Sequence, residues 1–302
     1  MSAGDTAHPR ALLTGIGLVI VAVACFATLD TTTKWVGASV PVLMALWFRY
    51  AFQAVATTLV VLPTQGLKVL RTAHPRFHML RGLLLMGMTL IAFVSLQHLP
   101  VAEFTAICML TPLSITLFAA IRLKEKVSLL RWMLVAGGFT GTLFIIRPDG
   151  GDFNWALLLP LALVATSTWF QLLTSKMTRT ENPVTMHLYT GWVGTLGASV
   201  ILPFVWAPVS SQALWWGMGL IGLMGTVGHF MLILAYQRAP AAILTPYLYG
   251  QIGFAMIGGW LMFSHVPDRW SLVGITMIAL CGAAGAWLAV RESRQRIDYV
   301  ES

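Results

Sequence analysis

Charged side chains are scarce in this sequence. Asp, Glu, Lys and Arg together make up 10% of the 302 residues, whereas globular proteins carry roughly 25%. Because a water-soluble fold cannot cover its surface with so few charges, the composition excludes an ordinary soluble domain and predicts an all-α polytopic membrane protein. No long polar block separates the apolar runs, so no additional soluble domain is expected.

Cysteines are also few, and the common catalytic motifs are missing. Cys25, Cys108 and Cys281 each lie inside an apolar run, with spacing that suits neither a metal site nor a disulfide framework. The sequence contains no HExxH, no GxSxG and no P-loop. We therefore predict no metal, no cofactor and no enzyme activity, and nothing suggests an intramembrane hydrolase or an ATP-driven pump.

Two glycine patterns invite other interpretations. Gly217, Gly219 and Gly222 match the dinucleotide-binding fingerprint, but two tryptophans precede them where a strand would be needed. Gly137 and Gly141 form a GxxxG pair. Both patterns are expected to serve close packing between membrane helices.

Apolar runs of about 20 residues predict transmembrane helices. The first run is too long for the apolar region of a signal peptide, so we expect it to be the first membrane span. Proline and glycine mark most of the gaps between runs. Ten spans are predicted, at residues 11–36, 42–62, 79–97, 101–121, 130–147, 155–177, 184–206, 213–236, 241–263 and 270–290.

The distribution of positive charge predicts the orientation. The net charge is +8, but the basic residues lie in short loops beside apolar runs, which argues against a nucleic-acid partner. With the predicted spans, 15 of the 19 Lys and Arg residues fall on the side of the N-terminus and 3 on the other side. Because positive loops stay inside, both termini are predicted to be cytoplasmic.

The chain also repeats itself. Shifting the numbering by 140 to 142 brings several residues onto identical ones: Lys34 onto Lys176, Pro41 onto Pro183, Gln97 onto Gln237 and Pro100 onto Pro240. We therefore expect two five-helix units, residues 11–148 and 155–290. Since five is odd, the second unit must enter the membrane from the opposite side, which makes an inverted repeat.

Several motifs of the first unit resemble those of a known family. They are the LPVA stretch, the mid-helix Pro112, the Leu123-Lys124-Glu125 sequence, Lys34 at the end of the first helix and Arg49 in the second. This arrangement resembles the EamA repeat of the drug/metabolite transporter superfamily, and within it the bacterial aromatic amino acid exporters. The second unit departs from the pattern, with His265 in place of Glu125 and Gly191 in place of Arg49.

The resemblance implies a secondary transporter of the bacterial inner membrane that exports aromatic and other neutral amino acids by alternating access. An exporter of another small metabolite or drug-like solute is the alternative. A channel is disfavoured because no ring of charges or carbonyl motif is present. The expected partners are an amino acid and the lipid bilayer, and the sequence is compatible with a monomer.

Three charged residues lie within the first two predicted spans, where charge is costly. Glu103, which opens the fourth predicted span, is expected to be a solvated first-turn acid. The four-residue spacing of Asp30 and Lys34 allows an ion pair, which would either stabilise the helix end or belong to an outer gate or proton site. Arg49 lies about 10 Å inside its helix at 1.5 Å per residue. We expect it to bind a structural partner, such as Asp30 or a helix carbonyl end, or else a substrate carboxylate.

Polar and aromatic side chains suggest where a solute would bind. A mostly apolar cavity with a few directed polar groups suits a small amphipathic solute. The candidate cavity residues are Met86, Phe93, Thr105, Met109, Thr168, Trp169, Gln171, Tyr247, Tyr249 and Gln251.

Overall fold

A computed structural model of the chain describes residues 9–122, 128–146, 155–177, 181–238, 244 and 247–301. The regular elements of these residues are all helical, as predicted. Their bounds are α1 Pro9–Gly37, α2 Val42–Gln65, η1 Gly66–Leu70, α3 Pro75–His98, α4 Val101–Cys108, α5 Thr111–Arg122, α6 Leu129–Ile146, η2 Trp155–Leu157, α7 Leu158–Met177, α8 Pro183–Val205, α9 Gln212–Arg238, α11 Gly250–Phe263 and α12 Arg269–Glu301.

Seven of the described helices are long and apolar enough to cross a membrane. Three shorter apolar stretches occupy the places of the fourth, fifth and ninth predicted spans: Val101–Ile115, which covers α4 and the start of α5, Trp132–Ile145 and Gly250–Phe263. The count of ten spans therefore stays a prediction. The basic cluster of Lys124 and Lys126, with Glu125, lies outside the described residues.

The prediction of one continuous fourth helix over residues 101–121 is wrong, because the chain breaks at Met109 and Leu110. Pro112 has no N–H to donate to the carbonyl of Cys108, and its ring would collide with that carbonyl in a regular helix. The hydroxyl of Thr111 donates to the Cys108 carbonyl instead, at 2.8 Å. The break thus keeps its backbone acceptor satisfied, as a membrane interior requires.

Two other predicted helices differ at their ends. The ninth was expected from residue 241, but α11 begins at Gly250, and residues 239–243 and 245–246 lie outside the described part of the chain. The tenth was expected to end at residue 290, whereas the helical backbone of α12 continues to Glu301. The polar segment after residue 290 is rich in Arg, Glu and Gln, which favour helix in water.

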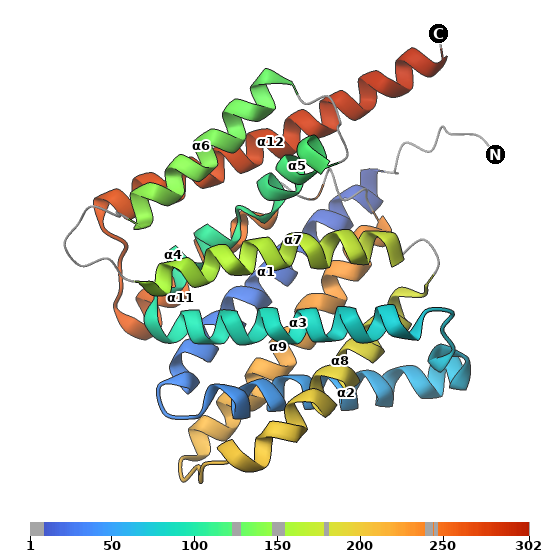
Figure 1. The fold of residues 1–302 in the computed structure, drawn as a ribbon, viewed down its shortest axis with the longest axis vertical. Helices are drawn as coiled ribbons and strands as arrows, with labels where there is room; N and C mark the ends of the chain where they lie inside the picture. Colours follow the sequence, from blue (N-terminus) through green and yellow to red (C-terminus); the bar gives the residue numbers. More distant parts are fainter. Residues whose placement is uncertain are drawn as a thin grey trace.

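The helices pack in pairs, each of which joins one helix of the N-terminal half of the chain to one of the C-terminal half. α1 packs along α9, α2 along α8, α3 along α7, α4 against α11, and α6 along α12. Figure 1 shows α5, α6 and α12 grouped at one end of the view and α2 and α8 at the other, with α1, α4, α7 and α11 between them. Both the start of α1 and the end of α12 lie on the same side of the molecule (Figure 1).

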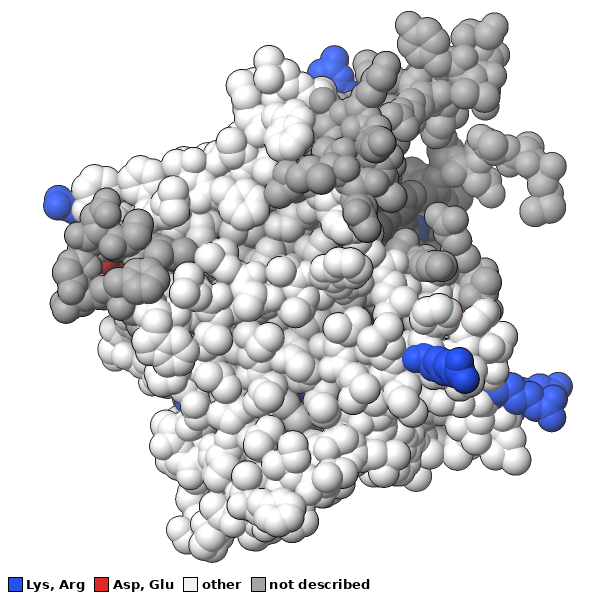
Figure 2. Space-filling view, viewed as in Figure 1, with Lys and Arg blue, Asp and Glu red and all other residues white. Residues whose placement is uncertain are grey.

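The surface agrees with a lipid environment. In the view of Figure 2, most of the described surface carries no charge, and the visible Lys and Arg side chains lie toward its margins. Many large apolar side chains are exposed, such as Phe204, Trp216 and Leu59. Exposed apolar area of this extent is expected where lipid, and not water, covers the helices.

Glycines bring α6 and α12 into close contact. A Cβ at Gly141 would lie 2.8 Å from the carbonyl oxygen of Gly274, and one at Gly137 would lie 2.7 Å from the sulfur of Cys281. The predicted packing role of the GxxxG pair is therefore confirmed. The fingerprint-like glycines lie inside α9. The packing role is confirmed for Gly217, which lies against Val36 of α1, and for Gly222, which lies against Phe52 of α2, but not for Gly219, where a Cβ would meet nothing within 4 Å.

The connections at the end of the molecule opposite the α1–α2 turn are tied together by Glu181, which precedes α8. Its Oε1 accepts hydrogen bonds from the Thr72 hydroxyl at 2.9 Å and from the backbone N–H groups of Ala73 and His74 at 3.2 Å. Nδ1 of His74 lies 3.1 Å from Oε1, and Nε2 of His78 lies 3.4 Å from Oε2. We call Thr72, His74, His78 and Glu181 the Glu181 cluster.

The Glu181 carboxylate is stabilised by these contacts. Its burial raises the pKa, but the hydrogen bonds from Thr72, His74 and His78 outweigh burial and hold the pKa of Glu181 below its ordinary value. Nearby, the hydroxyl of Thr185 on α8 donates to the carbonyl of Val69 at 2.9 Å. The α2–α3 connection is thereby fastened to the start of α8.

The α6–α12 contact predicts the effect of one methyl group. Gly141→Ala should lower the stability of the protein by about 1–3 kcal/mol, because the added Cβ forces two helices apart. Gly219→Ala is the matched control, since a Cβ there meets nothing within 4 Å and should be neutral or stabilising by up to about 1 kcal/mol. The free energy of unfolding of both variants is measured in detergent. Equal losses of stability in the two variants would contradict the close contact of α6 with α12.

The Glu181 cluster predicts a pH-dependent difference in stability. Glu181→Gln should lower the stability by about 1–3 kcal/mol at neutral pH, since hydrogen bonds to a charged group are lost. Because the folded pKa of Glu181 is lowered from 4.5, the wild type holds this advantage above pH 4.5 and loses it as the pH falls through the lowered pKa. Melting curves of both proteins measured against pH would refute the assignment if the gap persisted at the lowest pH.

Candidate functional site

α1 and α11 meet through polar groups in the membrane-embedded part of the molecule. Asp30 on α1 is buried, and its Oδ2 accepts a hydrogen bond from Nε2 of Gln251 at 3.2 Å. One residue further along α1, Thr31 lies so close to Gly258 of α11 that a Cβ there would overlap its hydroxyl. The structure thus joins the predicted gate residue Asp30 to the predicted cavity residue Gln251, which is 221 residues away.

A second polar contact joins α4 to the end of α11. Ser264 has a positive φ of 53° and ends α11, with its N–H bonded to the carbonyl of Trp260. This turn brings His265 back toward α4, where its Nε2 lies 3.1 Å from Oε1 of Glu103. Glu103 stands in the first turn of α4 and is buried, so the expectation that it is a solvated first-turn acid is wrong.

Lys34 binds the end of α3, not Asp30. Its ammonium donates to the carbonyls of Leu96 at 2.9 Å and Leu99 at 2.7 Å, which are orphan acceptors in the last turn of a helix. The expected ion pair between Asp30 and Lys34 is therefore not formed. The ammonium also lies 5.7 Å from the centre of the Phe263 ring of α11.

Several buried polar atoms in this region have no protein partner. Within the described part of the chain they include the hydroxyls of Thr33 and Thr105 and Oε2 of Glu103. These residues lie on α1 and α4, and both helices contact α11. A buried polar atom without a hydrogen bond is costly, so the meeting of α1, α4 and α11, which we call the central crevice, is suited to water or a polar solute.

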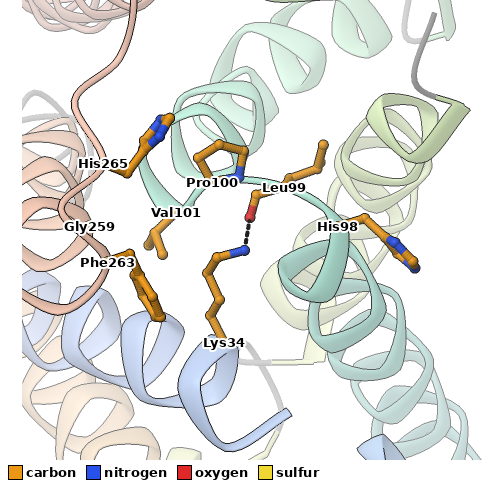
Figure 3. A pocket seen from close by; sticks show the side chains of 8 residues that line it. All are labelled: Lys34, His98, Leu99, Pro100, Val101, Gly259, Phe263 and His265. Atoms are coloured by element: carbon orange, nitrogen blue, oxygen red, sulfur yellow. Dashed lines mark hydrogen bonds between the residues drawn. The ribbon is translucent and has the colours of Figure 1, made fainter. Parts of the chain in front are cut away.

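A pocket of about 270 Å³ lies at one end of the central crevice (Figure 3). Its lining comes from α1, from the α3–α4 connection and from the end of α11. The lining side chains include Lys34, His98, Leu99, Val101, Phe263 and His265. Figure 3 shows the Lys34 ammonium reaching the α3–α4 connection, with Phe263 beside it.

Arg49 lies in a different polar group, between α2, α3 and α8. It is only 5% exposed, its Nη1 donates to the hydroxyl of Thr89 at 2.9 Å, and the guanidinium lies 4.9 Å from the centre of the Tyr50 ring. The partner is thus a hydroxyl, where Asp30 or a helix carbonyl was expected. Among the residues described, no carboxylate lies within ion-pair distance of Arg49.

Histidines extend this second group toward α9. Nε2 of Gln53 lies 3.3 Å from Nδ1 of His187 and donates to the carbonyl of the same residue at 3.3 Å. The ring of His187 lies 6.3 Å from that of His229, whose Nδ1 donates to the carbonyl of Gly225 at 2.8 Å. The bonds of Gln53 link α2 to α8, as polar groups between membrane helices commonly do, whereas the bond of His229 stays within α9.

Of the other cavity candidates, four are packed between helices. Met86 lies against Gly197 of α8, and Phe93 is buried in the apolar cluster that it forms with α1, α2 and α9. Met109 caps α4 at the break in the helix. The hydroxyl of Thr168 on α7 is buried and donates to the carbonyl of Val164 in its own helix.

The remaining candidates differ in exposure. Trp169 is 62% exposed and contacts Phe118 of α5, and Gln171 is exposed as well. Tyr247 is partly exposed, whereas Tyr249 is buried with its ring against Gly282 of α12. Among these four residues, the structure brings none within a hydrogen bond of Asp30.

His265 was not among the predicted site residues. It was noted only as a departure from the repeat, since it stands where the first unit has Glu125. Its pairing with Glu103 spans 162 residues, and local patterns carry no information on such a contact. Groups of three or more metal-binding side chains are not found among the described residues.

Known proteins resemble this chain over most of its length. The sequence profile of the EamA-like transporter family matches residues 13–147. A riboflavin transporter of Rhizobium johnstonii is 30% identical over 278 residues, which cover 89% of each chain. An S-adenosylmethionine uptake transporter of Rickettsia conorii is 26% identical, over 89% of this chain and 91% of the relative.

Two more matches extend the comparison. A pseudopaline exporter of Pseudomonas aeruginosa is 24% identical, over 89% of this chain and 94% of the relative. A crystal structure of a protein with 18% identity shares the fold, with a TM-score of 0.64 over 93% of this chain and 99% of the other. The chain is therefore a multi-pass membrane protein that belongs to the EamA-like transporter family.

Proposed function

We propose that this transporter moves aromatic and other neutral amino acids across the bacterial inner membrane by alternating access, and that it exports them. It acts as a secondary transporter. The central crevice is the solute path, and Asp30, Gln251, Glu103 and His265 lie along it.

One observation carries this proposal: unpartnered polar atoms gather where α1, α4 and α11 meet. At membrane depth such atoms are tolerated only where they face protein or a water-filled cavity. The charged groups there have both signs, with Asp30 and Glu103 opposite Lys34. Groups of both signs beside apolar side chains suit a zwitterion with an apolar side chain.

The helix pairing supports two inverted units at residues 11–148 and 155–290. With an offset of about 140 residues, α2 corresponds to α8, α6 to α12, and the α4–α5 segment to α11. Each of these elements packs against its own counterpart, and the contact of α1 with α9 has its counterpart in the contact of α3 with α7. An axis in the membrane plane that relates two inverted units would produce this pattern.

The two ends of the molecule differ in a way that suits alternating access. At the predicted cytoplasmic end, the Glu181 cluster and the Thr185 hydrogen bond fasten loops from both units. At the predicted outer end, the pocket lies between the same units. We infer that the structure is closed toward the cytoplasm, with its solute path nearer to the outer side.

A second candidate solute class comes from the relatives. Riboflavin and S-adenosylmethionine appear in the names of the relatives described above, and the sequence alone already left other small metabolites open. Those names include both uptake and export. The direction of transport must therefore be measured together with the solute.

Transport by purified protein in liposomes distinguishes the candidates. Radiolabelled tryptophan, phenylalanine, leucine, riboflavin and S-adenosylmethionine are tested separately, loaded inside for efflux and added outside for uptake. We expect counterflow of the aromatic and neutral amino acids, with riboflavin and S-adenosylmethionine near the level of protein-free liposomes.

Transport of riboflavin or S-adenosylmethionine would support the second solute class. Counterflow of riboflavin or S-adenosylmethionine without any amino acid flux would overturn the amino acid assignment and leave the family assignment intact. To fix the direction, a proton gradient of either sign is imposed. Accumulation against the solute gradient only on the inside would contradict export.

A further inference from the structure

Lys34 has one hydrogen-bond donor to spare. An ammonium carries three N–H groups, and the carbonyls of Leu96 and Leu99 accept two of them. In the described structure, no carboxylate lies within ion-pair distance of its Nζ. The third donor belongs to a cation that lines a pocket.

The position of the ammonium is fixed. Helix α3 ends at His98, and Leu99 continues in an extended conformation into Pro100. The two carbonyls at this helix end hold Lys34 in place, as cations at helix C-termini commonly are held. A ligand that binds the third N–H therefore meets a preorganised donor, which lowers the entropic cost of binding.

His265 supplies a second polar group in the same pocket. Its Nε2 lies 3.1 Å from Oε1 of Glu103, which orients the ring. Oε2 of Glu103 is buried without a hydrogen-bond partner.

The rest of the lining sets the chemical class of the ligand. The lining contains one lysine and two histidines, His98 and His265, and no acidic side chain. Phe263 and Val101 supply apolar surface. At about 270 Å³, the pocket is close to the lower end of the usual range of ligand sites, roughly 300 Å³, so it accepts one small group and not a whole large solute.

We propose that this pocket is a carboxylate-binding subsite at the outer end of the solute path, in which Lys34 holds the carboxylate and Phe263 contacts the adjoining carbon atoms. The subsite rests on the proposed transport function and narrows it to solutes with a free carboxylate. Helix capping by Lys34 is the competing explanation, and it predicts a loss of stability without any preference among ligands.

Three indole compounds separate the two explanations. Tryptophan and indole-3-propionate carry a carboxylate, whereas tryptamine does not. Affinities are measured by calorimetry on the detergent-solubilised protein. Since hydrogen bonds to charged groups contribute about 1.5–3 kcal/mol, Lys34→Gln should weaken binding of both carboxylates by about 10- to 100-fold and change tryptamine by less than about twofold.

Two further variants serve as controls. Lys34→Arg should restore part of the carboxylate affinity, because it keeps the charge. Lys68→Gln removes an exposed lysine of η1 at the other end of the molecule and should leave all three affinities unchanged. Equal losses for carboxylates and tryptamine in Lys34→Gln, or no loss at all, would overturn the subsite.

A chemical measurement tests the subsite even if the protein transports no amino acid. Reductive methylation of Lys34 is followed by mass spectrometry of the folded protein, with benzoate or benzamide as protecting compound. Benzoate should slow the methylation of Lys34 and benzamide should not, while Lys68 reacts equally in both. Protection together with a failed amino acid assay would refute the proposed solute and keep the subsite, and no protection by benzoate would refute the subsite.

Discussion

The constraint on which this structure depends is that a membrane interior offers no water to satisfy polar groups. Two departures from regular helix illustrate how side chains meet this need. Where Pro112 breaks the fourth predicted helix, the Thr111 hydroxyl takes the carbonyl of Cys108. Where α3 ends, Lys34 takes the carbonyls of Leu96 and Leu99. The second of these bonds lies in the wall of the pocket, whose lining includes Lys34 and Leu99.

The two groups of buried polar side chains, one around Arg49 and one in the central crevice, differ in their surroundings. The group around Arg49 links α2, α3 and α8 through hydroxyl, amide and imidazole bonds, and it belongs to the scaffold that joins the two halves of the chain. The central crevice leaves Thr33, Thr105 and one oxygen of Glu103 without partners, and Nε of Arg49 and Nε2 of His187 are unpartnered as well. What distinguishes the crevice is the pocket at its end, which is lined by Lys34 and Phe263 and gives a solute access to polar groups.

The sequence predicted the helices far better than the site. Long apolar runs, punctuated by proline, placed almost every helix start within a few residues, since the hydrophobic length needed to cross a membrane is fixed. The partners of individual side chains were harder to predict. Lipid-facing and protein-facing positions are both apolar, so Trp169 and Gln171 were expected in a cavity and are exposed. The bonds from Lys34 to Leu99 and from His265 to Glu103 join residues 65 and 162 positions apart, and no local pattern encodes them.

We propose that the two ends of the solute path open in alternation. Distances between spin labels in lipid nanodiscs test it most directly, with one pair at the exposed Ala38 and Val266 near the pocket and another at the exposed Leu67 and Asn182 beside the Glu181 cluster. On addition of the transported solute, the account predicts that one distance shortens while the other lengthens. Two distances that stay constant, or that change in the same direction, would contradict alternating access between these ends.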